Sequence, residues 1–243
     1  MNSKIIGTGS YIPKQSILNS SFLDHSFLDN HGNPILSKND EIIDKFQLIT
    51  GIKERKYVSN TRTSSDIAFE ASKIAINTSC IDAEKIDYII LAHNVGDVTN
   101  ESNQVDAMPS LASRVKSKLG IKNPNCVAYD ILFGCPGWVE GVIQANAFIK
   151  AGMAKKCLVV GADTLSRVLD QTDRDSMIYA DGAGAAVIEQ VDDKAGILSH
   201  KTVTYTYEGE ANFIFYGPSN LSRKGAKYIK MQGRKVYEFA LSK

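Results

Sequence analysis

Short apolar runs alternate with helical patterns along this chain, and that alternation is the feature that most constrains its fold. "IDYIILAHN" and "KCLVVGAD" are continuous apolar segments of strand length, a pattern typical of strands that are covered on both faces of a sheet. Between such segments the sequence has the periodicity of amphipathic helices, for instance at 64–79 and 136–152. Strands separated by helices of this length predict an α/β fold with a largely parallel or mixed sheet.

The expected helices have recognisable ends and buried faces. Residues 64–79 begin with a Ser/Asp cap, and the helix at 109–120 is expected to have Pro109 in its first turn and Gly120 at its end. The predicted buried residues are Ile67, Ala71, Ile74 and Ala75 in the helix at 64–79, and Val139, Val142, Ile143 and Phe148 in the helix at 136–152. The polar, turn-rich residues 24–40 are predicted to be an inserted loop ahead of a helix that Gly51 ends.

Composition narrows the class of protein. The 28 basic and 27 acidic side chains balance, and no basic block is present, which argues against a nucleic-acid partner. The first apolar stretch is too short for a signal peptide, and no apolar run approaches the roughly 20 residues that span a bilayer. Four cysteines without a CxxC pair argue against a metal cage or a disulfide framework. We therefore expect a cytoplasmic globular protein that neither binds a metal nor enters a membrane.

The segment "IGTGSYIP" begins like the glycine loop of a dinucleotide fold. Ile12 stands where the third glycine would be, and Pro13 follows at once, so no helix would start there. We predict a strand that ends in a tight turn. A nucleotide-binding oxidoreductase is disfavoured for the same reason, and absence of NAD binding in calorimetry would exclude it.

The histidines and one arginine are candidates for chemistry. His93 follows an apolar strand but has no evident partner, so we expect a partly exposed turn residue rather than a base or ligand. His25 and His31 lie in the polar insert and should be solvated, and His200 lies in a turn. Arg174, in "TDRD", either belongs to a solvated loop or clamps a phosphate or stacks on a base.

Cys135, in "YDILFGCPGWVEG", lies where a strand gives way to a helix. The free N–H groups and the positive dipole end of a helix N-terminus stabilise an anion, and the thiolate is the reactive form of cysteine. Gly134 and Gly137 would keep side chains away from an approaching carbonyl. The position is therefore suited to a nucleophile, although from spacing alone a small core thiol is the alternative.

Several motifs taken together resemble the ketoacyl-acyl-carrier-protein synthase III family of thiolase-like condensing enzymes. They are "TGIKER", "AYDILFGCPGWVEGVIQANAFIKAG", "CLVVGADTLSR", "TDRD", "DGAGAAVIE" and "KMQGRKVYEFA", in the order and at the spacings of that family. The resemblance implies a thiolase-like layered αβαβα fold of two similar halves, and usually a homodimer. Residues 1–231, with the insert at about 24–40, would be the N-terminal half, and 232–243 the start of the C-terminal half. The family's histidine and asparagine would lie beyond Lys243, so we expect this chain to be part of a longer protein.

The resemblance also implies roles for three residues. Cys135 would be acylated by an acyl-CoA starter, Arg174 would stack on the CoA adenine, and Met108 would cross the dimer interface and cap the partner's acyl pocket, limiting starter length. The implied reaction is a decarboxylating Claisen condensation with a malonyl thioester, an acyltransferase step of fatty acid biosynthesis and lipid metabolism. Acyl-CoA and acyl carrier protein would be the partners, and no metal or redox cofactor is expected.

Besides the histidine and asparagine expected beyond Lys243, two residues depart from the family pattern, and they change what is expected of the cysteine turn and of the starter. Pro136 follows the cysteine where the family has a small residue, which would stiffen the turn. The tryptophan that commonly precedes "TGI" is missing, since Trp138 is the sole tryptophan, so a carrier-bound or unusual starter is expected in place of the usual adenine sandwich.

Three alternatives to an enzyme of fatty acid initiation remain open. A specialised polyketide or secondary-metabolite ketosynthase and a hydroxymethylglutaryl-CoA-type synthase would keep the chemistry, whereas a non-catalytic ketosynthase-like partner subunit would not. Acylation of Cys135 separates an enzyme from a partner subunit.

A basic segment near the C-terminus, "SRKGAKYIKMQGRK", is either a landing patch for the acidic carrier protein or a solvated surface. Charge reversal at Lys227 and Lys230 should weaken carrier-dependent turnover if it is a landing patch. Its basic residues are Arg223, Lys224, Lys227, Lys230 and Arg234.

Overall fold

The two most apolar runs of the chain lie side by side in a mixed sheet, as strands β4 (Tyr88–Ala92) and β6 (Lys156–Thr164). The computed structural model describes residues 2–100, 102, 104–192, 194, 196–222 and 224–243. The chain divides into two units. Unit 1 comprises Met1–Pro13, Val58–Thr164 and Asp181–Thr202, and unit 2 comprises Lys14–Tyr57, Leu165–Ala180 and Val203–Lys243.

In the described part of unit 1, five strands form the sheet in the order β1-β7-β6-β4-β5. The strand β4 pairs in parallel with both β5 and β6, whereas β7 is antiparallel to β1 and β6. The predicted mixed sheet is therefore confirmed. The other elements of unit 1 are β1 (Asn2–Tyr11), α2 (Ser64–Ser79), a 3-10 helix (Ala83–Lys85), α3 (Leu111–Leu119), β5 (Val127–Ile131), α4 (Gly137–Lys150) and β7 (Asp181–Val191).

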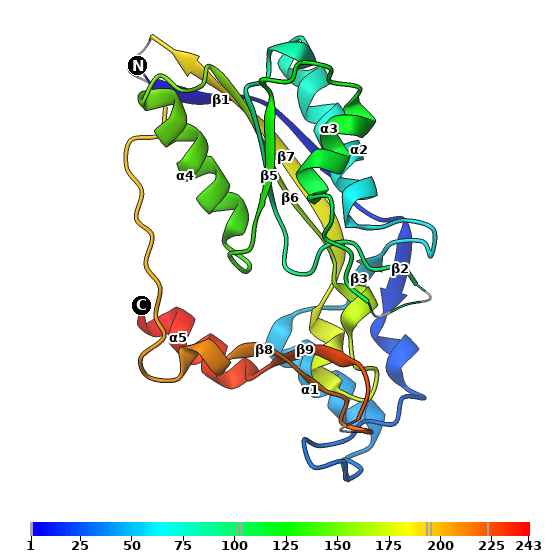
Figure 1. Cartoon of the computed structure of the whole chain (residues 1–243). Helices are drawn as coiled ribbons and strands as arrows, with labels where there is room; N and C mark the ends of the chain where they lie inside the picture. The colour runs from blue at the N-terminus through cyan, green and yellow to red at the C-terminus, as the bar shows by residue number, and fades with distance from the viewer. Residues whose placement is uncertain (1, 101, 103, 193, 195, 223) are drawn as a thin grey trace. The chain divides into compact units, whose positions relative to one another are not determined.

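Helices cover both faces of this sheet, with α2 and α3 on one side and α4 on the other (Figure 1). Along β4, Ile89 and Leu91 belong to the core under α2 and α3, while Ile90 belongs to the core under α4. Successive side chains of a strand point to opposite faces, so a strand buried on both sides must be apolar throughout. This explains the unbroken apolar run in the sequence.

The glycines of "IGTG" allow α2 to lie close to β1. A methyl group added to Gly9 would lie 2.2 Å from the carbonyl oxygen of Ala71, and one added to Gly7 would lie 2.6 Å from that of Ala75. Both glycines lie inside β1 rather than in a loop that leads into a helix. The motif is therefore a packing feature, in agreement with the prediction that it is not a nucleotide loop.

Two predicted helix faces need correction. On α2, Ile67, Ala71 and Ala75 are buried but Ile74 is exposed. On α4, Val139 is exposed, whereas Val142, Ile143 and Phe148 are partly buried, and Val142 and Phe148 pack against the core as predicted. The fully buried stripe lies at four-residue spacing on residues that the prediction left out, most of them small. The stripe is Gly137, Gly141, Ala145 and Ile149. Side chains four apart share one helix face, and small ones let the helix approach the sheet closely.

The helix ends follow the expected capping rules, with one shift. Helix α2 has a capping box between Thr63 and Asp66. Helix α3 begins at Leu111 behind an N-cap Ser110, whose hydroxyl accepts the N–H of Ser113. Pro109 therefore precedes the cap and is not in the first turn, because serine accepts the N-terminal amides better than the preceding residues could.

Unit 2 has a small core of its own, formed by Phe22, Phe27, Ile42, Ile43 and Met177. Buried Arg55 ties this core together through hydrogen bonds to the carbonyls of Met177 and Ile17. The elements of unit 2 are β2 (Gln15–Leu18), α1 (Asn39–Thr50), β3 (Glu54–Tyr57), β8 (Ile214–Pro218), β9 (Lys227–Met231) and α5 (Gly233–Ser242), with 3-10 helices at Asn19–Phe22, Leu165–Val168, Arg174–Ile178 and Glu210–Asn212. The pairs β2–β3 and β8–β9 are antiparallel.

The histidines of the polar insert differ from one another. His31 is exposed, as expected, and so is His200. His25 is not solvated as predicted: its half-buried ring packs edge-on against Phe22 and Phe27, with centroids 4.8 and 5.8 Å away. Burial lowers the pKa of His25.

None of the helices in the described residues is both long and apolar enough to cross a membrane.

Candidate active site

Cys135 lies in a tight turn between β5 and α4, on the N-terminal side of the helix. Gly134 adopts φ +72°, a left-handed conformation that glycine accepts without strain, and its carbonyl accepts the N–H of Gly137 at 3.0 Å. Pro136 has φ −80°, close to the value its ring imposes, so the proline fits the turn without distortion. The Cys135 side chain is exposed at the start of the helix.

The other three cysteines lack this combination of exposure and helix start. Cys126 and Cys157 are buried, and burial raises the pKa of both thiols, that of Cys157 to about 12. Cys80 is exposed but caps the C-terminal end of α2, where the helix dipole disfavours negative charge. Of the four thiols, Cys135 alone is both accessible and placed where an anion is stabilised.

Gly137 has a different role from the predicted one. A methyl group added there would lie 2.9 Å from the Cβ of Ala92 on β4, so the residue faces the sheet rather than a substrate. Because Gly137 has no side chain, the first turn of α4 packs directly on the sheet. This packing fixes the position of the turn that holds Cys135.

His93 is buried and paired, contrary to the expectation of a partly exposed turn residue. Its Nδ1 accepts the N–H of Gly96 at 2.9 Å, so the ring proton lies on Nε2, which faces Asp130 Oδ2 at 3.1 Å. The carboxylate of Asp130 also accepts the N–H groups of Leu111 and Ala112, both at 2.7 Å. Because both ring nitrogens are engaged, His93 supports the sheet edge and the start of α3 and is not a free base.

A second, partly buried carboxylate lies at the same edge of the sheet, near the end of β6. Asp163 accepts the backbone N–H of Asn94 at 2.9 Å and its side-chain amide at 2.7 Å. Burial raises the pKa of Asp163 in spite of these hydrogen bonds. The C-terminal ends of β4, β5 and β6 therefore bring His93, Asp130 and Asp163 to one edge of the sheet, the usual position of sites in α/β sheets.

Met108 lies just before α3 and is 85% exposed. The segment that leads to it is held to the preceding chain by two backbone hydrogen bonds between Asp97 and Asp106, of 3.0 and 2.8 Å. Met108 is thus an apolar side chain presented to the outside of unit 1.

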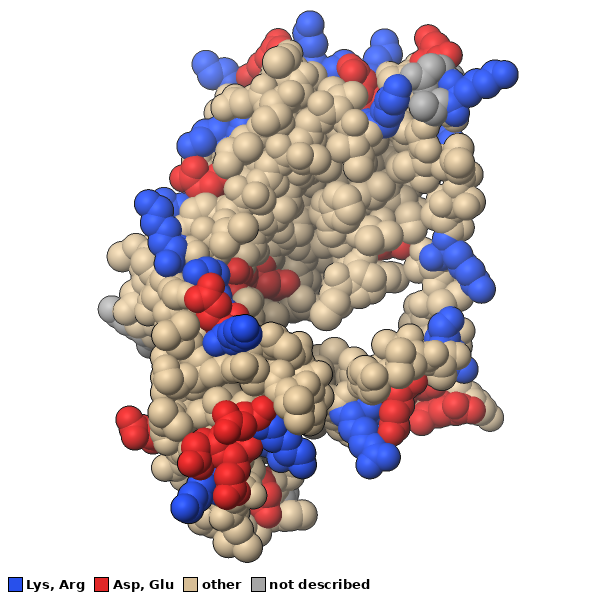
Figure 2. Space-filling view, turned by 180° about the vertical axis from the view of Figure 1, so that it is seen from behind, with Lys and Arg blue, Asp and Glu red and all other residues tan. Residues whose placement is uncertain are grey.

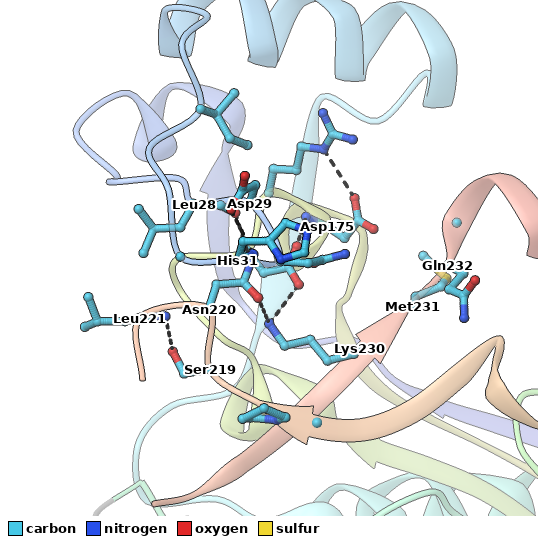
Figure 3. A pocket seen from close by; sticks show the side chains of 18 of the residues that line it. Leu28, Asp29, His31, Asp175, Ser219, Asn220, Leu221, Lys230, Met231 and Gln232 are labelled. Carbon is cyan, nitrogen blue, oxygen red and sulfur yellow. Dashed lines mark hydrogen bonds and ion pairs between the residues drawn. The ribbon is translucent and has the colours of Figure 1, made fainter. Parts of the chain in front are cut away.

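Arg174 lines a cavity of about 1100 Å³ in unit 2. Its side chain is 61% exposed, with Nε 3.9 Å from Asp175 Oδ1. Burial and the neighbouring Asp173 raise the pKa of Asp175. The insert contributes one wall of the cavity, including His31 (Figure 3), and β8, β9 and the start of α5 contribute the others.

Lys230 is not a surface residue, which corrects its assignment to a basic landing patch. Its buried ammonium donates to Asp170 Oδ2 at 2.6 Å and to Asp173 Oδ2 at 3.0 Å. It also donates to Asn220 Oδ1 at 2.9 Å (Figure 3). Burial opposes ionisation of Asp170, but hydrogen bonds from Lys230, Asn220 and Thr172 together bring its pKa down to about 2. A lysine side chain this deep needs such partners.

The rest of the predicted patch is exposed, where it is described. Lys224, Lys227 and Arg234 are exposed, Arg234 pairing with Glu238 at 2.7 Å, while Arg223 lies outside the described residues. On the face of the molecule in Figure 2, basic and acidic side chains are interspersed rather than gathered into one basic field. Among the described residues, no group of three or more His, Cys, Asp or Glu side chains could hold a metal ion.

Comparison with known proteins decides the family. The sequence model described as 3-Oxoacyl-[acyl-carrier-protein (ACP)] synthase III matches residues 129–206, which include the cysteine turn. The β-ketoacyl-[acyl-carrier-protein] synthase III 1 of Vibrio vulnificus is 36% identical over 246 residues, covering 100% of this chain and 69% of the relative. The chain belongs to the β-ketoacyl-[acyl-carrier-protein] synthase III family.

Solved synthase III structures match the fold over nearly the whole chain. That of Aquifex aeolicus is 30% identical and has a TM-score of 0.75 over 98% of this chain and 67% of its own. That of Pseudomonas aeruginosa is 25% identical and has a TM-score of 0.78 over 100% of this chain and 67% of its own. The predicted thiolase-like α/β fold and the class of condensing acyltransferase are thereby confirmed. Within this synthase III chain, Cys135 and Met108 belong to unit 1 and Arg174 to unit 2, and their roles stay predictions.

Proposed function

We propose that this synthase III chain carries the acyl-accepting site of an enzyme that initiates fatty acid synthesis. The reaction joins an acyl thioester starter to a malonyl thioester and yields a 3-oxoacyl thioester. The observation that carries the proposal is Cys135, an exposed thiol at a helix N-terminus inside the segment that the family model matches.

In the first half-reaction the Cys135 thiolate attacks the carbonyl carbon of the starter thioester. The carbonyl oxygen becomes an oxyanion, which backbone N–H groups at the start of α4 stabilise. The carbon–sulfur bond to the carrier thiol then breaks, the carrier leaves as a thiolate, and the acyl group remains on Cys135. The exposed turn, with glycine at 134, leaves room for this approach.

In the second half-reaction the malonyl thioester loses carbon dioxide, and the electron pair of the broken bond becomes a carbanion. The carbanion attacks the acyl-cysteine carbonyl, and Cys135 leaves as a thiolate, so atoms and electrons balance without a metal or redox cofactor. In the family a histidine and an asparagine assist this step. His93, the buried histidine of unit 1, cannot take that role because both of its ring nitrogens are engaged.

The partners follow from the same proposal. Arg174, exposed in its cavity, is suited to contact the adenine of acyl-CoA, and the exposed Lys227 and Arg234 are suited to contact an acidic carrier protein. Met108 would reach the acyl pocket of a second subunit, which makes the working form a homodimer. Because a partner tryptophan for the adenine is missing, the starter is carrier-bound or unusual. We place the enzyme in the cytoplasm.

The test is intact-mass spectrometry of the purified protein after incubation with a panel of acyl-CoAs and acyl carrier proteins. Wild type and Cys80→Ala should gain the mass of one acyl group, and Cys135→Ala should gain none. The Cys80→Ala variant is the matched control because it removes the other exposed thiol. Wild-type protein that stays unmodified with every thioester would contradict the proposal and favour a non-catalytic partner subunit.

A further inference from the structure

Arg114 of α3 holds the backbone on both sides of the peptide bond between Met108 and Pro109. Its Nε donates to the carbonyl of Pro109 at 3.0 Å, and its Nη2 donates to the carbonyl of Met108 at 2.9 Å. The planar guanidinium presents these donors in a fixed fork, which a lysine ammonium cannot reproduce. The main chain at Met108 is therefore fixed by a side chain of the first turn of α3, six residues further along the chain.

The same guanidinium is anchored to the rest of unit 1 through two carboxylates. Nη1 donates to Asp97 Oδ2 at 2.9 Å, and Nη2 also donates to Asp106 Oδ1 at 2.6 Å. Asp97 is buried and accepts both the N–H and the hydroxyl of Ser65, at the start of α2, at 2.7 Å each. Arg114 thus connects the Met108 segment to the first turn of α2 through charge-assisted hydrogen bonds.

The start of α3 is fixed independently from the sheet. The carboxylate of Asp130 accepts the N–H groups of Leu111 and Ala112, and it also accepts a hydrogen bond from His93 Nε2. Helix α3 therefore cannot shift along its axis without breaking these bonds, and Arg114 moves with it. Together the two anchors define where Met108 stands relative to the sheet.

Met108 itself is 85% exposed, although its backbone is fixed in this way. An apolar side chain held on an ordered main chain is prepared for a contact outside its own unit, since the entropy of ordering the segment is already lost on folding. We infer that Arg114 is the positioning residue that sets where Met108 reaches, and thereby sets the limit on the acyl chain. This inference rests on the proposed function, in which Met108 caps the partner's pocket.

The experiment measures the rate at which straight-chain acyl-CoAs acylate Cys135 in wild type and variants, with intact-mass spectrometry as the readout. The quantity compared is the ratio of the rate with longer chains to the rate with short ones. Arg114→Gln should raise the rate with longer chains relative to short ones by about tenfold, the size of one lost contact in an apolar pocket. Met108→Ala should change this ratio in the same direction. In the double variant the ratio should match that of Met108→Ala alone, because Arg114 acts through Met108. Arg114→Lys should restore part of the wild-type ratio.

Lys116→Gln is the matched control, since it removes the hydrogen bonds from α3 to the carbonyls of Asn123 and Cys126 and leaves the partners of Arg114 in place. A purely structural role of Arg114 would slow all chain lengths alike and leave the ratio unchanged, which would overturn the inference. Additive effects of Arg114→Gln and Met108→Ala would overturn it as well. Wild-type protein that no thioester acylates would refute the proposed function itself, and the inference with it; wild-type acylation with an unchanged ratio would refute only the positioning role.

Discussion

Replacing Lys230 by methionine should test how unit 2 is held together. The lysine side chain is 8% exposed and that of Asp170 is 4% exposed, with 2.6 Å between the ammonium and the carboxylate. Removing one partner of a buried ion pair leaves an uncompensated charge and costs about 3–5 kcal/mol. Asp170 keeps hydrogen bonds from the N–H groups of Asn220 and Thr172, so the lower end applies. We expect Lys230→Met to lower the free energy of unfolding by about 3 kcal/mol at neutral pH.

The assay is equilibrium unfolding in urea, followed by two probes. The single tryptophan, Trp138, lies in unit 1, whereas far-UV circular dichroism reports on helices of both units. If Lys230→Met destabilises unit 2 alone, the dichroism transition should move to lower urea ahead of the fluorescence transition.

Lys227→Met provides the control for this variant. Lys227 is an exposed lysine of the same strand, β9, so its replacement should change the unfolding free energy by no more than about 0.5 kcal/mol. The double variant Lys230→Met/Asp170→Asn removes both charges and should recover part of the loss. If Lys230→Met proved no less stable than Lys227→Met, the reasoning from the buried pair would be refuted. The result also bears on carrier binding, because charge reversal at Lys230 would disturb the fold itself.

Three further predictions follow from single positions. Gly137→Ala should cost about 1–3 kcal/mol in urea unfolding and slow acylation of the thiol, because the added methyl meets the sheet; Gly184→Ala, with open space around its added methyl, should do neither. Asp130→Asn should lower the unfolding free energy by about 1–2 kcal/mol, seen as a lower urea midpoint at constant slope, because the carboxylate accepts two helix amides and faces His93. The pKa of Asp170 is about 2 in the folded chain against about 3.9 unfolded, so its stabilisation, on the order of 2–3 kcal/mol, is complete above about pH 5 and is lost as the pH falls toward 2. Asp170→Asn should therefore lose less stability than wild type between about pH 6 and 3, and equal slopes would contradict the assignment.

The strands were predictable because burial on both faces demands an unbroken apolar run. The face of α4 was predictable only in part, because ranking residues by hydrophobic size includes the exposed Val139, whereas close approach to the sheet selects Gly137 and Gly141. The signal was present as small residues at four-residue spacing.

The partner of His93 could not be read from spacing, since Asp130 is 37 residues away. The pair forms because β4 and β5 are parallel neighbours with Ala92 opposite Ile131, which brings the ends of both strands together. A carboxylate inside an otherwise apolar strand, as in "AYDIL", is the sequence signal for such a partner. The exposed place of Cys135 ahead of a helix was predictable because its sequence signal is local, a cysteine between Gly134 and Gly137 where a strand gives way to a helix. The partners of Lys230 were not, because Asp170 and Asp173 lie on another segment of unit 2.

The two buried thiols lie on opposite faces of the sheet of unit 1. Cys126 belongs to the core under α2 and α3, and Cys157 to the core under α4. A maleimide added to native protein that lacks Cys80 and Cys135 can reach either thiol only when the corresponding helix layer opens. The rates at which mass tags appear at Cys126 and at Cys157 would therefore measure the opening of each layer separately, within one chain and without a denaturant.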